Sequence, residues 1–386
     1  MKKRIIILGS TGSIGTKTLE VIRDFAEDFE VVALSTHGQV ELLAEQVQAV
    51  SPRAICVTSP EKQSAGEEIA RHAGIEFLPG EAGLTGLIRR YDADMVMVAT
   101  VGFVGTAPTL AAIERGMTIA LANKEVLVCA GHIVMAAAHK AGVPVLPVDS
   151  EHNAIFQCLN GSNPRDIRRL ILTASGGPFR GRSRDQMTGL TSADALRHPT
   201  WNMGAKITID CSTLMNKGFE VIEAAHLFDL PVEQVDVVVH PQSVIHSMVE
   251  YADGSIIAQM GVTDMYFPIQ NILLYPERRA NKYPPLDFAA LGQMTFEAPD
   301  RESFPCLDYA YQAARTGGTM PAVLNGANEI AVARFLAGEI GYLDISGITG
   351  AAMQAHETGA GHTLEEIQAA DAWARQFATG AARTAV

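Results

Sequence analysis

The chain of 386 residues is long enough for about two or three domains, each with its own apolar core. Its hydrophobic share of 47% and charged share of 19% are typical of a compact globular enzyme and exclude a disordered chain. The formal net charge of −13 makes the surface as a whole repel nucleic acid and anionic membranes. We therefore expect no nucleic-acid or membrane partner, and an anionic ligand requires a local basic site.

Cysteine usage and the N-terminus favour a cytoplasmic protein. The five cysteines are dispersed and include no CxxC pair, which indicates a reducing compartment rather than a disulfide framework or a zinc site. The apolar run after the basic start is too short for a signal peptide. Residues 95–113 carry no charge, but Gly102, Gly105 and Pro108 interrupt them, so we expect a strand, a loop and a helix start instead of a membrane helix.

A glycine-rich turn near the N-terminus predicts a nucleotide site. Residues 5–8 are a continuous apolar run, as in a strand buried on both faces of a parallel sheet, and residues 18–25 have a helical pattern. The GxxGxxG turn between them presents backbone amides and a helix N-terminus, which suit a pyrophosphate. A purely structural turn is the alternative. The glycines of this turn are Gly9, Gly12 and Gly15.

The next predicted strand, residues 30–34, favours NADPH over NADH. An NAD site usually has an acidic residue for the ribose hydroxyls about 20 residues after the glycines. This chain has none there, and the strand is followed by His37, Gly38 and Gln39. That segment leaves room for a 2′-phosphate, which His37 and nearby hydroxyl or amide donors can meet.

Alternating strands and helices predict a doubly wound α/β domain. Further strands are expected at residues 54–58, 95–100, 118–122 and 143–148. Ligands of such sheets bind beyond the carboxyl ends of the strands. Two polar clusters stand at such ends, Asn123-Lys124-Glu125 and Asp149-Ser150-Glu151. Taken alone, Lys124 has the alternative of a solvated lysine at a helix start.

The second cluster predicts half of a metal site. If the chain is extended there, Asp149 and Glu151 project to the same side, because side chains alternate along a strand. Mg²⁺ and Mn²⁺ favour a few carboxylate oxygens and keep positions open for substrate oxygens. The alternative is a solvated acidic turn.

The chain after residue 153 supplies the other candidate site residues. A strand at 167–173 leads to Ser175, and the following Gly-, Ser-, Thr- and Arg-rich stretch to 203 suits a mobile lid, with a long surface loop as the alternative. Another strand is expected at 206–210. Beyond it, Asn216 and Lys217 suit a phosphate, and Glu220 can complete a carboxylate triad or be a surface glutamate.

The remaining segments are expected to have structural roles rather than catalytic or binding ones. Strands are expected at 235–239 and 255–260; His240 and His246 between them lack a third ligand in phase, so we interpret them as structural. Residues 275–285 have the composition of a linker. From residue 304 the chain is largely helical, with a capping box at 363–366.

Eight segments, taken together and in order, resemble the 1-deoxy-D-xylulose 5-phosphate reductoisomerase family over nearly the whole chain. They are GSTGSIG, LANKE, LPVDSEHNAIFQ, ASGGPFR, HPTWNMGAKI, LMNKGFEVIEA, HPQSVIHSMVEY and NGANEIAVA. The resemblance implies a Rossmann-like NADPH domain at 1–149, an α+β catalytic domain at 150–274 with a mobile lid at about 175–205, a linker at 275–300 and a helical bundle domain at 301–386. It also implies a homodimer.

The resemblance assigns roles to named residues. The metal ligands fall on Asp149, Glu151 and Glu220, for Mg²⁺, Mn²⁺ or Co²⁺. Catalysis is expected from these carboxylates with Lys124, which stabilises charge or relays a proton. Substrate contacts fall on Lys124, Ser150, Glu151, Ser175, His198, Trp201, Cys211, Asn216, Lys217 and Glu220. Cofactor contacts fall on Gly9, Thr11, Gly12, Ser13, Ile14 and Gly15 of the glycine-rich turn and on His37, Gly38, Gln39, Asn123, Glu125, Met203 and Gly204.

Two positions depart from the family pattern. The family usually has a phosphate-binding serine where this chain has Cys211, whose thiol is a weaker donor, so that Ser212 or a backbone amide substitutes. A common family pattern for the 2′-phosphate is Gly-Lys-Asn, where this chain has His37-Gly38-Gln39. Neither departure removes a metal ligand.

The implied activity is metal-dependent rearrangement of 1-deoxy-D-xylulose 5-phosphate, by retro-aldol cleavage and aldol re-addition. Reduction by NADPH then gives 2-C-methyl-D-erythritol 4-phosphate, in the non-mevalonate isoprenoid pathway. A metal-free dehydrogenase of a semialdehyde or hydroxy acid on the same scaffold is the first alternative. A non-catalytic NADPH-binding regulatory protein is the second, although it gives no reason for three carboxylates and a lid.

Overall fold

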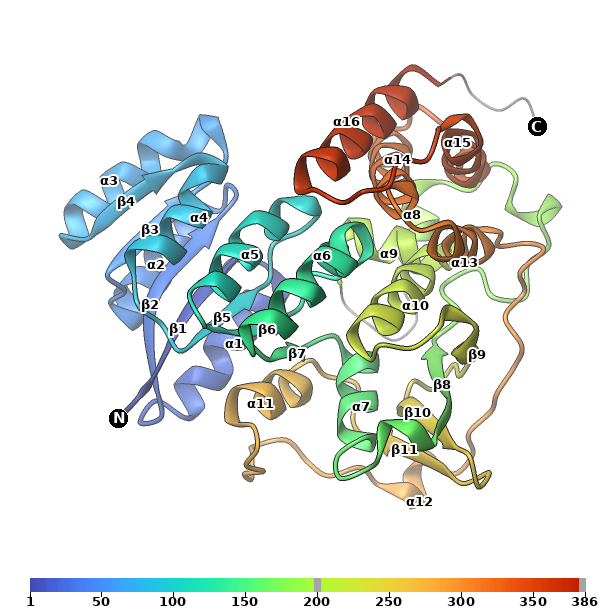
Figure 1. The fold of residues 1–386 in the computed structure, drawn as a ribbon, viewed down its shortest axis with the longest axis horizontal. Coiled ribbons are helices and arrows are strands. Elements are labelled where there is room, and N and C mark those ends of the chain that lie inside the picture. Colours follow the sequence, from blue (N-terminus) through green and yellow to red (C-terminus); the bar gives the residue numbers. More distant parts are fainter. Residues whose placement is uncertain (198–202, 382–386) are drawn as a thin grey trace. The chain divides into compact units, whose positions relative to one another are not determined.

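The computed structural model describes residues 1–197 and 203–381 and divides the chain into two compact units (Figure 1). Unit 1 comprises residues 1–126, 134–153 and 264–281; unit 2 comprises 127–133, 154–263 and 282–386. This is a coarser division than the four segments expected from the sequence, whose boundaries stay a prediction. Within the described residues, no helix combines the length and the apolar character needed to cross a membrane.

Unit 1 is built on a seven-stranded sheet in which every strand pair is parallel. The strand order is β4-β3-β2-β1-β5-β6-β7, so the chain starts in the middle of the sheet and winds outward in both directions. The strands are β1 (Lys3–Leu8), β2 (Phe29–Thr36), β3 (Ala54–Val57), β4 (Glu76–Pro79), β5 (Met95–Val98), β6 (Thr118–Leu121) and β7 (Val145–Pro147). The predicted doubly wound fold is confirmed.

The helices that connect these strands follow the same alternation. They are α1 (Ser13–Asp24), α2 (Val40–Val50), α3 (Gln63–Ala73), α4 (Gly80–Arg90), α5 (Thr106–Glu114) and α6 (Glu125–Ala141), with 3-10 turns η1 (Pro60–Lys62) and η2 (Phe103–Gly105). The sequence pattern missed β4, because a four-residue strand that is half-buried and ends in Pro79 gives little signal.

A helix from late in the chain, α11 (Tyr266–Leu274), also belongs to unit 1. It packs on α1: the Tyr266 hydroxyl donates to Asp24 at 2.9 Å, and Lys17 pairs with Asp264 at 3.4 Å just before the helix begins. Lys3 in β1 donates to the Leu273 carbonyl at 2.7 Å. These contacts tie α11 to the first sheet and its helix α1.

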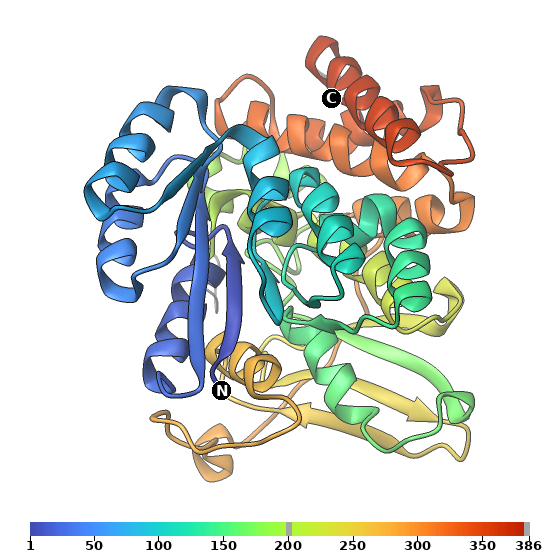
Figure 2. The same cartoon turned by 60° about the vertical axis from the view of Figure 1, so that its left-hand side comes forward.

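Unit 2 contains a four-stranded sheet of order β11-β10-β8-β9. Its strands are β8 (Ile167–Ala174), β9 (Val235–Val239), β10 (Ile245–Tyr251) and β11 (Ile256–Met260). β10 lies antiparallel to both β8 and β11, as Figure 2 shows, and β8 runs parallel to β9. β10 was not predicted from the sequence, because His246, Ser247 and Glu250 interrupt its apolar run although all three are buried.

Helices make up the rest of unit 2. They are α7 (Ser150–Cys158, which starts in unit 1), α8 (Ser192–Ala195), α9 (Ala205–Ser212), α10 (Met215–Leu227), α12 (Phe288–Leu291), α13 (Cys306–Thr316), α14 (Met320–Leu336), α15 (Tyr342–Ala355) and α16 (Leu364–Gly380), with turns η3 (Pro164–Asp166), η4 (Asp185–Met187) and η5 (Val232–Gln234). α14 packs against α13, α15 and α16, which confirms a helical C-terminal region. At the start of α16 only half of the predicted capping box forms: Thr363 accepts from the Glu366 amide at 3.2 Å, while Glu366 accepts from the His362 amide.

The strand expected at 206–210 is wrong, because these residues form helix α9. The alternating pattern that suggested a strand is equally compatible with a helix whose Lys206 and Asp210 pair four residues apart, at 2.9 Å. Asp210 is 1% exposed and also accepts from Asn328 of α14 at 2.8 Å. This tertiary partner is remote in the sequence and no local pattern reveals it.

Candidate active site

The glycine-rich turn lies between β1 and α1, and two of its glycines are required by the fold. Gly9 has φ of +84°, and a Cβ there would lie 2.4 Å from the Ala99 carbonyl oxygen. A Cβ on Gly15 would lie 2.3 Å from the Gly9 carbonyl oxygen. Gly12, the N-cap of α1, differs: its φ is −73°, and the nearest atom to an added Cβ is 3.5 Å away. The protein itself therefore does not require a glycine at 12, whereas a ligand approaching the backbone closely does.

The other predicted cofactor residues of this region lie just beyond the ends of β1 and β2. Ser13 and Ile14 form the first turn of α1, and Thr11 makes a hydroxyl–hydroxyl bond of 2.6 Å with Thr36 at the end of β2. β2 continues two residues beyond the predicted strand, so His37, Gly38 and Gln39 start the loop immediately after it. The His37 Nδ1 atom bonds to the Thr58 hydroxyl at 2.9 Å.

The Asn123-Lys124-Glu125 cluster stands at the junction of β6 and α6, and all three side chains are buried. Asn123 donates to the Thr100 hydroxyl and to the Gly102 carbonyl, both at 2.9 Å. It thereby ties the segment after β5 to the end of β6. The Lys124 ammonium donates to Asp149 at 2.6 Å. The structure thus brings the two clusters at neighbouring strand ends into contact.

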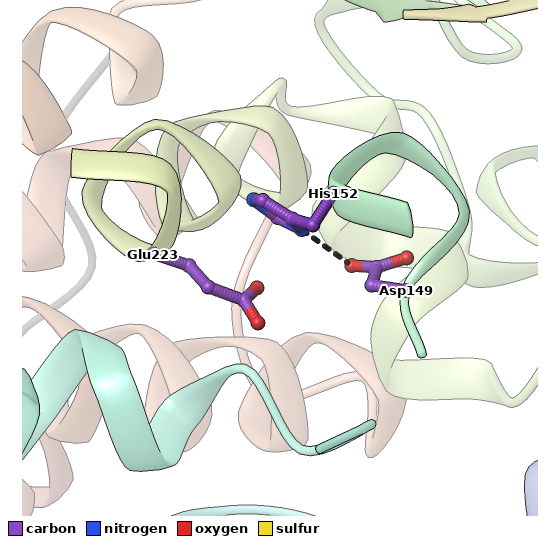
Figure 3. Close-up of side chains that lie close together, drawn as sticks. All are labelled: Asp149, His152 and Glu223. Carbon is purple, nitrogen blue, oxygen red and sulfur yellow. Dashed lines mark ion pairs between the residues drawn. The ribbon is translucent and has the colours of Figure 1, made fainter. Parts of the chain in front are cut away.

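The Asp149-Ser150-Glu151 segment is not extended, which corrects the geometry expected from the sequence. β7 ends at Pro147 and α7 begins at Ser150, so Glu151 lies in the first turn of a helix. Asp149 accepts from the Ser150 amide at 2.9 Å, and the Ser150 hydroxyl donates to Glu151. His152 Nδ1 lies 3.8 Å from the Asp149 carboxylate, the ion pair drawn in Figure 3.

In unit 2, the buried face of α10 carries two residues predicted to bind phosphate, Asn216 and Lys217, and one predicted metal ligand, Glu220. Glu220 is 1% exposed and accepts from the Asn216 amide at 2.5 Å and from the Lys217 ammonium. The predicted cation and the predicted carboxylate therefore pair with each other here. Leu214, the N-cap of α10, has φ of +61°, a left-handed conformation that costs energy for a leucine.

Ser175 and Cys211 come from two segments that pack together. Ser175 follows β8, and its hydroxyl accepts from the Gly177 amide at 3.3 Å. A Cβ on Gly177, whose φ is +69°, would lie 2.6 Å from the Cys211 carbonyl oxygen in α9. The close approach of these backbones requires a glycine and fixes the loop after β8 against the end of α9.

The segment predicted to be a lid is described only in part. Its segment 175–205 contains η4, α8 and the start of α9. The predicted substrate residues His198 and Trp201 lie outside the described residues, whereas Met203 and Gly204 directly precede α9, with Gly204 as its N-cap.

His240 has both ring nitrogens engaged, with the Thr295 carbonyl at 3.0 Å and the Val244 amide at 3.2 Å, in keeping with a structural role.

Sequence reasoning gave no role to two buried titratable side chains. His152 and Glu223, both labelled in Figure 3, are 0% exposed. His152 lies one turn after Asp149, and Glu223 lies one turn after Glu220 on α10. Each of the two lies three residues after a predicted metal ligand, and side chains three residues apart lie on the same face of a helix. This spacing is the sequence signal that could have identified His152 and Glu223.

Comparisons with known proteins agree with this picture along the chain. The family model for 1-deoxy-D-xylulose 5-phosphate reductoisomerase matches residues 5–131, the model for its C-terminal domain matches 145–228, and the model for the DXP reductoisomerase C-terminal domain matches 260–377. The reductoisomerase of Caldanaerobacter subterraneus subsp. tengcongensis is 52% identical over 97% of this chain and 98% of that protein.

Solved structures of the same enzyme also match. The reductoisomerase from Zymomonas mobilis in complex with NADPH has a TM-score of 0.91 at 44% identity, covering 98% of each chain. A reductoisomerase in complex with NADPH, fosmidomycin and magnesium has a TM-score of 0.93 at 42% identity, covering 98% of this chain and 97% of that one. The chain described here belongs to the 1-deoxy-D-xylulose 5-phosphate reductoisomerase family.

Proposed function

We propose that this protein converts 1-deoxy-D-xylulose 5-phosphate to 2-C-methyl-D-erythritol 4-phosphate with NADPH and a divalent metal ion, a step of the non-mevalonate isoprenoid pathway. The observation that carries the proposal is a match to one enzyme family over 97% of the chain. The glycine turn and the carboxylates at the strand ends supply the chemistry that this reaction needs.

NADPH fits the unit 1 sheet. The pyrophosphate would lie against the amides at the N-terminus of α1, where Gly12 leaves room, and the ribose end would lie beyond β2 near His37, Gly38 and Gln39. Asn123 and Glu125 would contact the nicotinamide half, together with Met203 and Gly204 from the segment before α9. When bound, NADPH supplies the hydride that reduces the aldehyde.

The metal would be held by Asp149, Glu151 and Glu220. An all-oxygen set of carboxylates suits Mg²⁺, Mn²⁺ or Co²⁺. Glu220 is buried, and in this structure the Lys217 ammonium supplies the cation beside it. A bound divalent ion supplies Lewis-acid stabilisation of the substrate oxygens. His152 would support Asp149 from the first turn of α7, where its Nδ1 lies 3.8 Å from the Asp149 carboxylate.

Protein cations would position the substrate. Lys217 and Asn216 would bind its phosphate with Ser175, while Cys211 contributes at most a weak thiol donor. Lys124, held in place by Asp149 at 2.6 Å, would stabilise charge on a substrate hydroxyl or relay its proton, with Ser150 beside it. Phosphate binding at the remote end supplies energy for closing the lid, in which His198 and Trp201 would cover the substrate.

The deciding experiment follows the loss of NADPH absorbance with 1-deoxy-D-xylulose 5-phosphate. We expect turnover with Mg²⁺ or Mn²⁺ and none after full chelation, restored when the ion is added back. Activity that survives chelation would instead support a metal-free dehydrogenase. Tight NADPH binding without turnover across sugar phosphates would support a regulatory protein.

A homodimer and a cytoplasmic location are part of the proposal. β11 is an edge strand of its sheet, and it exposes Ile256 and Ile257 at 52% and 46%. An exposed apolar edge strand is a natural surface for a second copy. Sedimentation showing only monomers at micromolar concentration would exclude the dimer. The five cysteines form no disulfide within the described chain, in keeping with a reducing compartment.

A further inference from the structure

The loops that follow β2 and β3 lie side by side at the ribose end of the expected cofactor site. The two strands are parallel neighbours, with Thr36 opposite Val57. Beyond them, the Ser59 amide donates to the His37 carbonyl at 2.9 Å, and the Thr58 hydroxyl bonds to His37 Nδ1. A group bound by residues 37–39 is therefore within reach of the loop after β3.

Lys62, the last residue of η1, has its side chain close to Gly38 in the loop after β2. Its Cγ lies 3.7 Å from the position that a Cβ on Gly38 would take, and the Ser59 Cβ lies 3.8 Å from the same point. Lys62 is exposed, and within residues 1–197 and 203–381 its ammonium makes no ion pair. A lysine without an ion pair in the described residues therefore has the stem of its side chain next to Gly38, which carries no side chain of its own.

The one carboxylate in this loop is already engaged. Glu61 accepts from the Ser59 hydroxyl at 2.7 Å, and this bond, with the backbone bond and the charge of His37, lowers the pKa of Glu61. A ribose 2′-phosphate carries close to two negative charges at neutral pH, by analogy with other phosphate monoesters. It therefore needs a cation as well as the neutral donors of this loop.

We propose that Lys62 meets the 2′-phosphate of NADPH and determines the preference for NADPH over NADH in this protein. It supplies from the β3 loop the charge that Gly38 does not supply from the β2 loop. The inference rests on the proposed NADPH dependence and adds a residue that lies outside the glycine turn and the 37–39 segment.

The test measures nucleotide binding by the full-length protein without substrate or metal. NADPH and NADH are titrated by calorimetry, and 2′-AMP and 5′-AMP serve as fragments that differ in the phosphate position. Since a charge-assisted bond of this kind contributes about a factor of ten, Lys62→Gln should raise the Kd for NADPH and 2′-AMP about tenfold. The Kd for NADH and 5′-AMP should stay within about twofold.

Two further variants control the result. Lys140 is exposed near the C-terminal end of α6, and Lys140→Gln removes the same charge without changing either affinity. Gly38 has no left-handed φ and has room for a side chain, so Gly38→Lys in the Lys62→Gln background should restore NADPH binding. This rescue would show that a cation at the site, rather than the fold of the loop, sets the affinity.

Three outcomes would overturn the proposal. Equal weakening of NADPH and NADH would place Lys62 against the adenosine rather than the phosphate. Unchanged NADPH affinity would remove any role for it. A wild-type protein that binds NADH as tightly as NADPH would assign the ribose to Glu61 instead. A wild-type protein that binds neither nucleotide would overturn the proposed function itself, a result distinct from a changed ratio.

Discussion

Gly12 and Gly15 form a matched pair that separates cofactor binding from folding. An added methyl group at Gly15 would lie 2.3 to 2.6 Å from backbone atoms of Gly9 and Ser10, well inside contact distance. Backbone cannot move aside as a side chain can, so we expect Gly15→Ala to destabilise unit 1 by about 3 kcal/mol or more. For a domain of this size that lowers the Tm by several degrees.

Gly12→Ala should behave in the opposite way. Its φ of −73° and ψ of 173° suit alanine, and the nearest atom to the new methyl group, the Gly9 carbonyl oxygen, is 3.5 Å away. The unfolded chain loses entropy, so stability should be unchanged or higher by about 0.4 to 1 kcal/mol. The methyl group would nevertheless obstruct the pyrophosphate, and the Kd for NADPH and NADH should rise together by about tenfold or more.

Thermal unfolding and nucleotide titration of both variants make the test. A Gly12→Ala protein that binds NADPH as tightly as the wild type would show that the pyrophosphate does not approach this turn. A Gly15→Ala protein with an unchanged Tm would refute the steric argument. Equal loss of both nucleotides at Gly12 also contrasts with the selective loss expected at Lys62, so the two sites are distinguished in one set of titrations.

Two further predictions concern unit 2. Glu220→Gln should lower turnover by at least about a hundredfold, because it removes a carboxylate expected to bind the metal, while the Kd for NADPH stays within about twofold. Glu365→Gln on α16 is the exposed control variant. A wild-type rate for Glu220→Gln would reject the assignment of Asp149, Glu151 and Glu220 as the metal ligands. Burial, with a smaller contribution from His132, lowers the pKa of His226 from 6.5 to about 4, so the native state takes up fewer protons than the unfolded state between these values. Stability is then fully present above pH 6.5 and is lost as the pH falls toward 4, by up to about 3 kcal/mol. Urea unfolding between pH 7.5 and 4.5 checks this, and a His226→Gln protein with the same pH dependence as the wild type would contradict it.

The sheet of unit 1 was predictable because its strands are buried on both faces. Runs such as residues 5–8 and 95–98 are apolar without interruption, and the glycine turn fixes which end of the sheet binds ligands. β4 and β10 escaped detection because each mixes polar and apolar residues over a short span. These segments become strands because they pair with a neighbouring strand, and a local sequence pattern holds no information about that pairing.

The errors at Lys206 to Asp210 and at Asp149 to Glu151 have a common physical origin. In both places a polar residue alternates with others in a way that fits a strand, yet a helix begins there. Asp210 is stabilised by Asn328, and α11 joins unit 1 through a bond between Tyr266 and Asp24. Such partners lie more than a hundred residues away in the sequence, so the helix is chosen by tertiary contacts.

Each unit pairs a lysine with a carboxylate that is expected to hold the metal. Lys124 bonds to Asp149 at 2.6 Å in unit 1, and Lys217 bonds to Glu220 within the buried face of α10 in unit 2. A buried carboxylate without a cation is costly, so these lysines stabilise the folded chain before any ligand arrives. With a divalent ion held by the carboxylates, Lys124 and Lys217 would be free to bind substrate oxygens and phosphate. Charge balance would therefore couple metal binding to substrate binding. Lys217→Met removes the cation that pairs with Glu220, so it should weaken binding of the substrate phosphate while metal binding stays as tight as in the wild type or becomes tighter; weakened metal binding in this variant would refute the argument.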